Sequence, residues 1–345
     1  MEENEKNNEH KRRVRYQGRY PRKFAEKYKE LQPEKYAEEI EKIKAKGKTP
    51  AGMHIPIMVG EILEFLDIKP GMRGLDATLG YGGHSEKMLE KLDGAGHLLA
   101  IDVDSEEMAK TTARLRALGY DEDIFSVKKS NFADLINLAE KYGKFDFILA
   151  DLGVSSMQID NPERGFSYKF DGPLDLRLDQ SKGATAAERL AELSEEEIEG
   201  MLIDNADEPY AAPIAKEISK LKRNGTQIVS TMQLSYIIAN ALAFLPPAER
   251  AEEVKKSCRR TFQALRIDVN SEYEVLESFL EAVPEALNEG GKIAVLTFHS
   301  GEDRLVKKAF KRLKKEGKLS EAAAEVIRPS REECYQNPRA HSTKM

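Results

Sequence analysis

Three aspartates stand at positions where carboxylates commonly bind a ligand. Asp76, Asp102 and Asp151 each lie at the end of a short apolar segment that predicts a β-strand. Open α/β sheets bind ligands beside the carboxyl ends of their strands, so the three carboxylates are expected at one edge of a sheet. A carboxylate at the end of a second strand, such as Asp102, can accept hydrogen bonds from both hydroxyls of a ribose.

A glycine-rich turn follows the first of these segments. Gly80, Gly82 and Gly83 lie where a strand leads into a helix, and glycine lets a ligand approach the backbone closely. Their spacing differs from the Gly-x-Gly-x-x-Gly pattern that cradles a pyrophosphate, which disfavours a nicotinamide cofactor. S-adenosylmethionine instead offers a carboxylate and an ammonium group, for which backbone groups and Asp76 are suitable partners. The alternative for Asp76 and Asp102 is a strand-ending or helix-capping role.

The elements that position these residues alternate between strand and helix. The predicted strands cover residues 74–78, 97–102, 124–128, 145–151 and 292–297. The predicted helices cover residues 58–66, 85–92, 105–118, 133–142, 269–287 and 302–315. This alternation predicts an α/β fold with a mainly parallel sheet covered on both faces.

The alternation is interrupted by a purely helical stretch. Helical periodicity covers residues 186–193, 195–203, 210–221, 231–242 and 248–256, and Ser194 and Ser230 are plausible N-caps. We therefore predict three parts: a charged N-terminal extension (1–52), a catalytic domain (53–175 and 260–345), and an all-helical substrate or lid domain inserted into it (176–259).

Composition limits the class of protein. No apolar run is long enough to span a membrane and the N-terminus is too charged for a secretory signal, which predicts a cytoplasmic protein without a membrane partner. Cys258 and Cys334 lack neighbouring ligands, so no metal site is expected. The net charge is −6, yet the first 50 residues carry an excess of Lys and Arg. Tyr16 and Tyr20 within that segment suit stacking on nucleic-acid bases, although a solvated tail is equally consistent.

Longer motifs point to one family. They are Asp151–Asp160, Arg164–Tyr168, Gly172–Arg177, Thr261–Ile267 with Asn270, and Phe298–Ser300 with Glu302–Arg304. Over His54 to His341 this set resembles the bacterial 16S ribosomal RNA cytosine-N4 methyltransferase family, RsmH or MraW. The resemblance implies a class I, Rossmann-like fold that uses S-adenosyl-L-methionine as its cofactor. It also implies a cytidine of 16S ribosomal RNA in the small ribosomal subunit as the methyl acceptor.

The family's cofactor contacts match this sequence position by position. Matching residues are Gly82, Gly83 and His84 in the first turn, Asp102 for the ribose, Phe132 beside the adenine, and Asp151 and Gln158 near the methionine end. Core packing is the alternative for Phe132, and local packing at a helix start is the alternative for His84.

Acceptor-side residues are expected near the same edge. Asp151 is the candidate catalytic group, because a carboxylate that accepts a hydrogen of N4 stabilises the positive charge developing on nitrogen. The substrate candidates are Arg164, Phe166, Arg177, Arg266 and His299, with Tyr168 and Phe298 as further stacking aromatics. Surface ion pairs are the alternative for the arginines, and a histidine satisfied within the fold is the alternative for His299.

Several positions depart from the family pattern. Lys256–Arg259 replaces a His-Pro-Ala-Thr run, Asn205–Glu208 replaces Tyr-Gly-Glu-Glu, and Gly301 replaces a leucine. These departures and the basic extension indicate a divergent branch. Two other functions stay open: methylation of another acceptor (other RNA, DNA or protein), and a non-catalytic RNA-binding assembly factor. The oligomeric state is also open, with a dimer as one option.

Overall fold

A fully parallel, five-stranded sheet forms the centre of the computed structural model, which describes residues 56–345. The strand order is β3-β2-β1-β4-β5. The strands are β1 (Arg73–Asp76), β2 (His97–Asp102), β3 (Phe125–Lys129), β4 (Phe145–Asp151) and β5 (Leu287–Leu296). The basic N-terminal segment, the predicted extension and its linker lie outside the described residues. The α/β class with a parallel sheet is confirmed.

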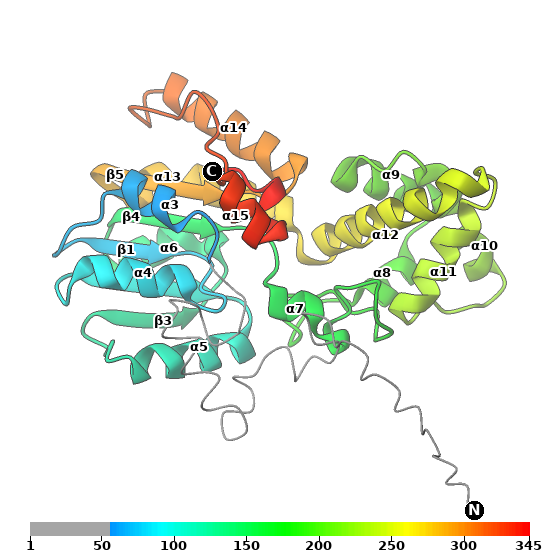
Figure 1. Cartoon of the computed structure of the whole chain (residues 1–345), viewed down its shortest axis with the longest axis horizontal. Helices are drawn as coiled ribbons and strands as arrows, with labels where there is room; N and C mark the ends of the chain where they lie inside the picture. The colour runs from blue at the N-terminus through cyan, green and yellow to red at the C-terminus, as the bar shows by residue number, and fades with distance from the viewer. Residues whose placement is uncertain (1–55) are drawn as a thin grey trace, which may run out of the picture. The chain divides into compact units, whose positions relative to one another are not determined.

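Helices cover both faces of the sheet (Figure 1). One layer contains α3 (Val59–Leu66), α4 (Gly83–Leu92) and α5 (Ser105–Ala117), which share a buried core with β2 and β4. The other contains α6 (Leu135–Tyr142), α13 (Glu272–Ala286) and α14 (Ser300–Lys315). Chain order reverses between β1 and β4, which lie side by side at the centre of the sheet. Their carboxyl ends therefore form the crevice where such sheets bind ligands.

Close packing explains a glycine inside the central strand. Gly74 of β1 is paired with Phe147 of β4. A Cβ atom on Gly74 would lie 2.0 Å from the ring of Phe147, a separation that no side chain tolerates. The missing side chain lets the fully buried Phe147 ring fill the space beside β1.

The helical insertion has a core of its own. Its helices are α8 (Ala186–Glu192), α9 (Glu195–Ala206), α10 (Ala211–Arg223), α11 (Thr231–Ala241) and α12 (Pro247–Asn270). Their apolar faces pack into one cluster of buried residues. Ser194 and Ser230 each accept a hydrogen bond from the third backbone N–H of the helix that follows, so both predicted caps are confirmed.

The end of the insertion differs from the prediction. One continuous helix, α12, replaces the predicted break after residue 256, and it ends at Asn270. Phe262 and Leu265 of this helix are buried in the insertion core, so the insertion extends past the predicted boundary at residue 259. The segment contains neither glycine nor proline after Pro247, and nothing local stops the helix before Ser271, whose φ is +49°.

Smaller elements complete the fold. They are the short helices η2 (Phe132–Asp134), α7 (Ser156–Asp160), η3 (Pro162–Arg164), α15 (Arg331–Gln336) and η4 (Pro338–Ser342). Near the C-terminus, Lys344 pairs with Thr297 in an antiparallel bridge directly after β5. Within residues 56–345, no helix is long and apolar enough to cross a membrane.

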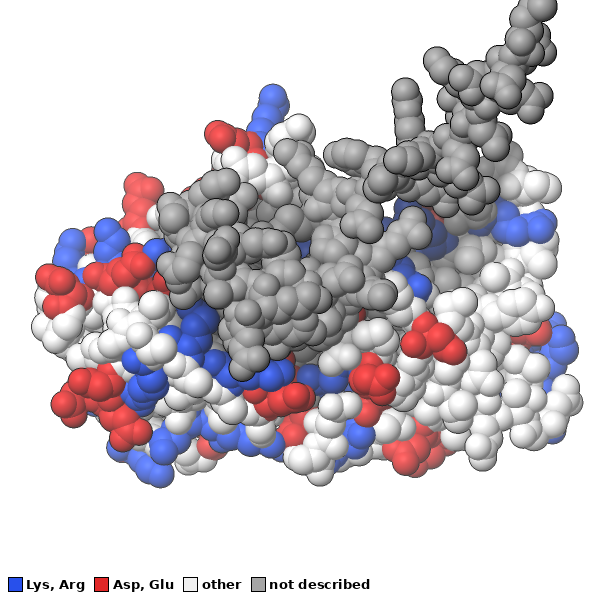
Figure 2. Space-filling model, turned by 60° about the horizontal axis from the view of Figure 1, so that its bottom comes forward, with Lys and Arg blue, Asp and Glu red and all other residues white. Residues whose placement is uncertain are grey.

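Charge is unevenly distributed over one face of the molecule. In Figure 2, positive and negative side chains are interleaved on the left, whereas the part over the insertion at lower right carries few charges. The sequence from Gly225 to Ala248, which contains α11, has no Asp, Glu, Lys or Arg. Met232, Tyr236 and Phe244 in this segment are exposed. The insertion therefore presents an uncharged surface around α11 rather than a basic one.

Candidate functional site

The glycine turn after β1 is held to the end of β2. The backbone N–H of Gly80 donates to Oδ2 of Asp102 at 2.8 Å. Gly80 has a φ of +47°, and a Cβ there would meet only the Thr78 carbonyl oxygen, at 3.9 Å. Open space therefore borders the turn at Gly80, beside the Asp102 carboxylate.

The other two glycines of the turn are required by packing. A Cβ on Gly82 would lie 2.6 Å from Cγ2 of Thr111 in α5, and its φ is +74°. A Cβ on Gly83 would lie 2.4 Å from Cγ of Pro56. These glycines let the turn pack closely between neighbouring segments, which is a reason for glycine that is separate from ligand approach.

Asp102 ends β2 with its carboxylate in a ring of backbone donors. Oδ1 accepts the N–H of Asp104 at 2.9 Å, and Oδ2 accepts that of Gly80. Burial raises the pKa of Asp102 above its ordinary value, against the lowering effect of these hydrogen bonds. Each oxygen has lone pairs left, so the carboxylate can accept the hydroxyls of a ribose.

Asp76 and Asp151 bring two carboxylates to the ends of β1 and β4. Asp76 is 1% exposed and accepts hydrogen bonds from the Ser85 hydroxyl at 2.6 Å and the Thr78 N–H at 3.1 Å. Burial raises the pKa of Asp76. Oδ1 of Asp151 is buried and has no hydrogen-bond partner among the described residues. A buried carboxylate oxygen without a partner can bind a hydrogen-bond donor or a cation.

The charges around Asp151 favour an incoming cation. Burial, together with charge repulsion from Asp76 and Glu302 and against the opposing effect of His84, raises the pKa of Asp151 to about 6. Nδ1 of His84 lies 3.4 Å from Oδ2 of Asp151. Nε2 of His84 is 2.9 Å from the Ile57 carbonyl oxygen, which can only accept, so Nε2 carries a proton. The acids outnumber the bases here, and the site is electronegative.

Phe132 and Gln158 lie at the same edge of the sheet, and both side chains contact other residues of the fold. The Phe132 ring packs edge-to-face on Phe279 with centroids 5.1 Å apart. Gln158 is 8% exposed; its Nε2 donates to Asp104 at 2.9 Å and its Oε1 accepts the Ser155 N–H at 2.8 Å. Both residues therefore lie at this edge of the sheet, and the amide of Gln158 links the loops after β2 and β4.

The arginines predicted as substrate contacts have partners inside the fold. Arg164 is 5% exposed and donates only to groups inside the fold. Arg177 forms a two-pronged ion pair with Asp175, and Arg266 forms one with Glu272. Guanidinium groups that are occupied in this way have little left to offer an RNA phosphate. The motifs that contain these arginines do not show which residues will be their partners.

The predicted stacking aromatics separate into two groups. Phe166 is buried at 9% exposure in the insertion core, and Tyr168 packs edge-to-face on Phe262 at 6.0 Å. Both rings pack in the insertion, so base stacking by Phe166 would require its ring to leave the insertion core. Phe298 instead lies beside the loop after β4, since a Cβ on Gly153 would be 3.8 Å from its Cδ2.

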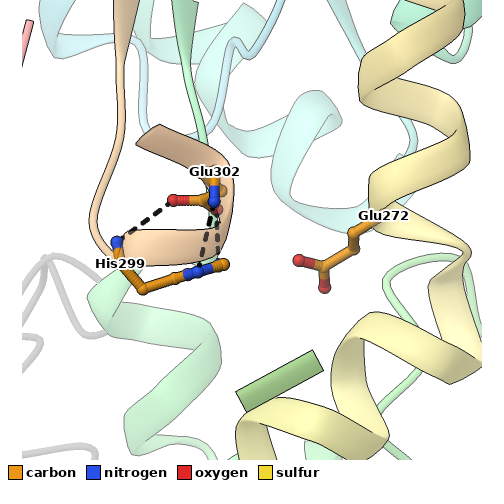
Figure 3. Close-up of side chains that lie close together, drawn as sticks. All are labelled: Glu272, His299 and Glu302. Atoms are coloured by element: carbon orange, nitrogen blue, oxygen red, sulfur yellow. Dashed lines mark hydrogen bonds and ion pairs between the residues drawn. The ribbon is translucent and has the colours of Figure 1, made fainter. Parts of the chain in front are cut away.

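His299 begins α14 and pairs with a buried glutamate. Its Nε2 lies 3.1 Å from Oε1 of Glu302, whose Oε2 accepts the Phe298 N–H at 2.8 Å. Figure 3 shows these two side chains facing each other, with Glu272 opposite on α13. The three side chains have metal-binding atoms within 4.8 Å of one another. Arg266 already balances the charge of Glu272, so the group forms an ion-pair network beside Asp151 rather than a set of free ligands.

Two of the departures from the family pattern, Asn205 and Gly301, lie on either side of the Tyr273 hydroxyl. The Tyr273 hydroxyl donates to the Asn205 carbonyl oxygen at 3.0 Å, and a Cβ on Gly301 would lie 1.8 Å from that hydroxyl. Nearby, the Ser257 hydroxyl donates to the buried carboxylate of Glu208 at 2.8 Å. Gly301 thus makes room for the contact of Tyr273 with the insertion.

We expect Gly301→Ala to lower the free energy of unfolding by about 1–3 kcal/mol, because the new methyl group displaces Tyr273. Thermal unfolding of the variant measures this loss. In a Tyr273→Ala background the same substitution has room, and alanine favours the helix, so the loss should disappear. An equal loss in both backgrounds would show that Tyr273 is not the cause.

Comparisons with known proteins extend over nearly the whole chain. The model of the MraW methylase family matches residues 51–345. A ribosomal RNA small subunit methyltransferase H 1 of Agathobacter rectalis is 60% identical over 98% of this chain and 97% of its own length. A protein of the same name from Lachnoclostridium phytofermentans is 59% identical over 97% of this chain and 92% of its own length.

A third relative is less similar and aligns with a smaller share of this chain. Ribosomal RNA small subunit methyltransferase H of Leptothrix cholodnii is 39% identical over 84% of this chain and 90% of its own length. The two more similar relatives align over 336 and 337 of the 345 residues, so their similarity includes most of the basic N-terminal segment. That segment is shared with relatives carrying a numbered name.

Proposed function

This chain belongs to the MraW methylase family, and from that premise we propose that it uses S-adenosyl-L-methionine to methylate N4 of a cytidine in 16S ribosomal RNA. The fold is the class I, Rossmann-like methyltransferase fold with a helical insertion, as the sequence predicted. The relatives named as small-subunit ribosomal RNA methyltransferases support the choice of acceptor. The partner is then the small ribosomal subunit, which implies a cytoplasmic location.

The observation that carries the proposal is the group of carboxylates at one edge of the sheet. Asp76 is buried, Asp151 is half-buried with its Oδ1 enclosed, and the repulsion between the two carboxylates is offset only in part by His84. A ligand that brings positive charge would relieve this repulsion. S-adenosylmethionine has an ammonium and a sulfonium group, and it supplies an electrophilic methyl group. The residues present therefore fit this cofactor.

Each residue of the edge has a distinct task in binding. Asp102, with lone pairs left beside its two backbone donors, accepts the ribose hydroxyls. Asp76 and Asp151 hold the positively charged methionine end. Gly80 leaves the backbone open beside Asp102. Phe132 closes the adenine side of the edge with its packed ring.

The acceptor base fits against the loop after β4. Gly153 has a φ of +91° and no side chain, which leaves room for a flat ring next to Phe298. Cytosine N4 is a weak nucleophile because its lone pair is delocalised, so alignment must supply much of the rate. The Asp151 carboxylate accepts a hydrogen bond from the N4 amino group, stabilises the positive charge that develops on nitrogen, and takes up the proton that N4 loses once the new N–C bond has formed. Phe298 holds the base by stacking.

Mass spectrometry of labelled nucleosides tests the proposal. Purified protein is incubated with small ribosomal subunits or their RNA and with isotope-labelled S-adenosylmethionine, and the RNA is digested to nucleosides. We expect the label in N4-methylcytidine. Label in a different nucleoside would replace the acceptor. Cofactor binding without label in any nucleoside would favour the non-catalytic RNA-binding alternative.

A further inference from the structure

A buried ion pair connects the cofactor edge with the insertion. Asp104 and Arg164 are 4% and 5% exposed, and Nη1 of Arg164 lies 2.6 Å from Oδ2 of Asp104. Removing two charges from water is costly, so a buried pair needs good geometry and further hydrogen bonds. Both residues have such bonds. Those of Asp104 reach the loops at the edge of the sheet, and those of Arg164 reach the insertion.

Asp104 ties together the loops after β2 and β4. Its N–H donates to the Asp102 carboxylate, and its Oδ1 accepts the first free N–H groups of α5 at 3.2 Å. Its Oδ2 also accepts Nε2 of Gln158 at 2.9 Å, and Oε1 of Gln158 accepts the Ser155 N–H. The neighbouring Arg164 lowers the pKa of Asp104, against the effect of burial. One ionised carboxylate thus fixes the spacing between two ligand-binding loops.

Arg164 reaches the connection that enters the insertion. Its Nη2 donates to the carbonyl oxygens of Arg177 and Leu178 at 3.1 and 2.9 Å. The Leu178 N–H donates to Oδ1 of Asn270 at 2.8 Å, and Nδ2 of Asn270 donates to the Leu176 carbonyl oxygen at 2.8 Å. Asn270 is the last residue of α12, where the chain leaves the insertion. Arg164 therefore contacts the entry of the insertion at the point where its exit is also held.

We propose that Arg164 is a positioning residue that couples the cofactor-binding loops to the helical insertion through its bond to Asp104. Its Nη1 keeps the loops after β2 and β4 in their binding arrangement, and its Nη2 keeps the insertion in place for the RNA. The inference rests on the proposed function, because it takes S-adenosylmethionine as the ligand of those loops and ribosomal RNA as the second substrate; it adds the insertion as a contact for that RNA.

Two substitutions separate the contact of Arg164 with Asp104 from its contact with the insertion. Arg164→Met removes both halves, and we expect about 10-fold to 100-fold weaker binding of S-adenosylmethionine in calorimetry, the range of a lost bond to a charged group. Arg164→Lys keeps a charge for Asp104 but lacks the fork that reaches the carbonyl oxygens. For this variant we expect affinity for S-adenosylmethionine within about 3-fold of the parent and a KM for small-subunit RNA raised about 10-fold.

Matched variants distinguish positioning from general stabilisation. Arg189→Met breaks the 2.9 Å ion pair between Arg189 and Asp268 inside the insertion and should lower the Tm without changing affinity for S-adenosylmethionine. If Arg164→Met does not fold, Asp104→Asn with Arg164→Met removes both charges and leaves neither stranded. This double variant should bind S-adenosylmethionine as weakly as expected for Arg164→Met.

The outcomes that overturn the inference are specific. Unchanged affinity for S-adenosylmethionine in Arg164→Met, or in the double variant, would remove the link to the cofactor loops. An unchanged KM for RNA in Arg164→Lys would remove the link to the insertion. If the unaltered protein binds no S-adenosylmethionine, the proposed function fails and this inference fails with it. If the unaltered protein binds S-adenosylmethionine and the variants bind it equally well, only this inference fails.

Discussion

Asp102→Ala should weaken binding of S-adenosylmethionine at least about 100-fold, since it removes a charged acceptor from two ribose hydroxyls at about 1.5–3 kcal/mol each. The lost carboxylate also releases the Gly80 and Asp104 N–H groups, which loosens the turn around the ligand. Calorimetric titration measures the affinity, and circular dichroism establishes that the variant is folded. Asp102→Asn keeps an acceptor of the same size and should lie between the variant and the parent.

Asp121→Ala is the matched control for this experiment. Asp121 is an exposed aspartate that accepts a backbone N–H two residues later, in the loop before β3 and so at the opposite edge of the sheet. Its removal should leave the affinity for S-adenosylmethionine unchanged. Retained affinity in a folded Asp102→Ala protein would remove Asp102 from the ribose site and leave it a purely structural role in the turn.

The fold could be predicted because its signals are local. Apolar strands that alternate with helices of ordinary length determine a parallel sheet, and the acids that end those strands mark its ligand-binding edge. Asp76, Asp102 and Asp151 meet at the predicted edge for this reason. The two serine caps in the insertion could be predicted for the same reason, since a cap depends only on the residues of the next helical turn.

The sequence did not show the partners that lie far away along the chain. Nothing near Arg164 shows that Asp104 will bury its charge, and nothing near Arg266 singles out Glu272 as its partner over other acids. A buried phenylalanine and a base-stacking one have the same local pattern, so the sequence did not show that Phe166 packs in the insertion core. Asp104 itself carried one usable signal, because an aspartate directly before a predicted helix is a good N-cap.

Asp151→Asn should reduce the rate of methyl transfer by about 100-fold to 1000-fold, the usual effect of removing one group that stabilises developing charge. The amide oxygen of asparagine can still accept a hydrogen bond from N4, but it carries no negative charge to offset the positive charge that develops on nitrogen. The pKa of Asp151 is about 6 without ligand, so kcat/KM for S-adenosylmethionine should rise with pH through that value. A bound cation lowers the pKa of a neighbouring carboxyl, so the corresponding rise in kcat should occur at lower pH.

Stability gives an independent check on the same residue. Because folding raises the pKa of Asp151 above 3.8, ionisation of its carboxyl opposes folding, and its destabilising effect grows as pH rises from about 4 to 6. Asp151→Asn removes this effect and should melt at a higher temperature than the parent at pH 7, while losing activity. A variant that loses activity and also melts at a lower temperature would point to a structural role. A variant with normal activity and no rise near pH 6 would exclude Asp151 from the reaction.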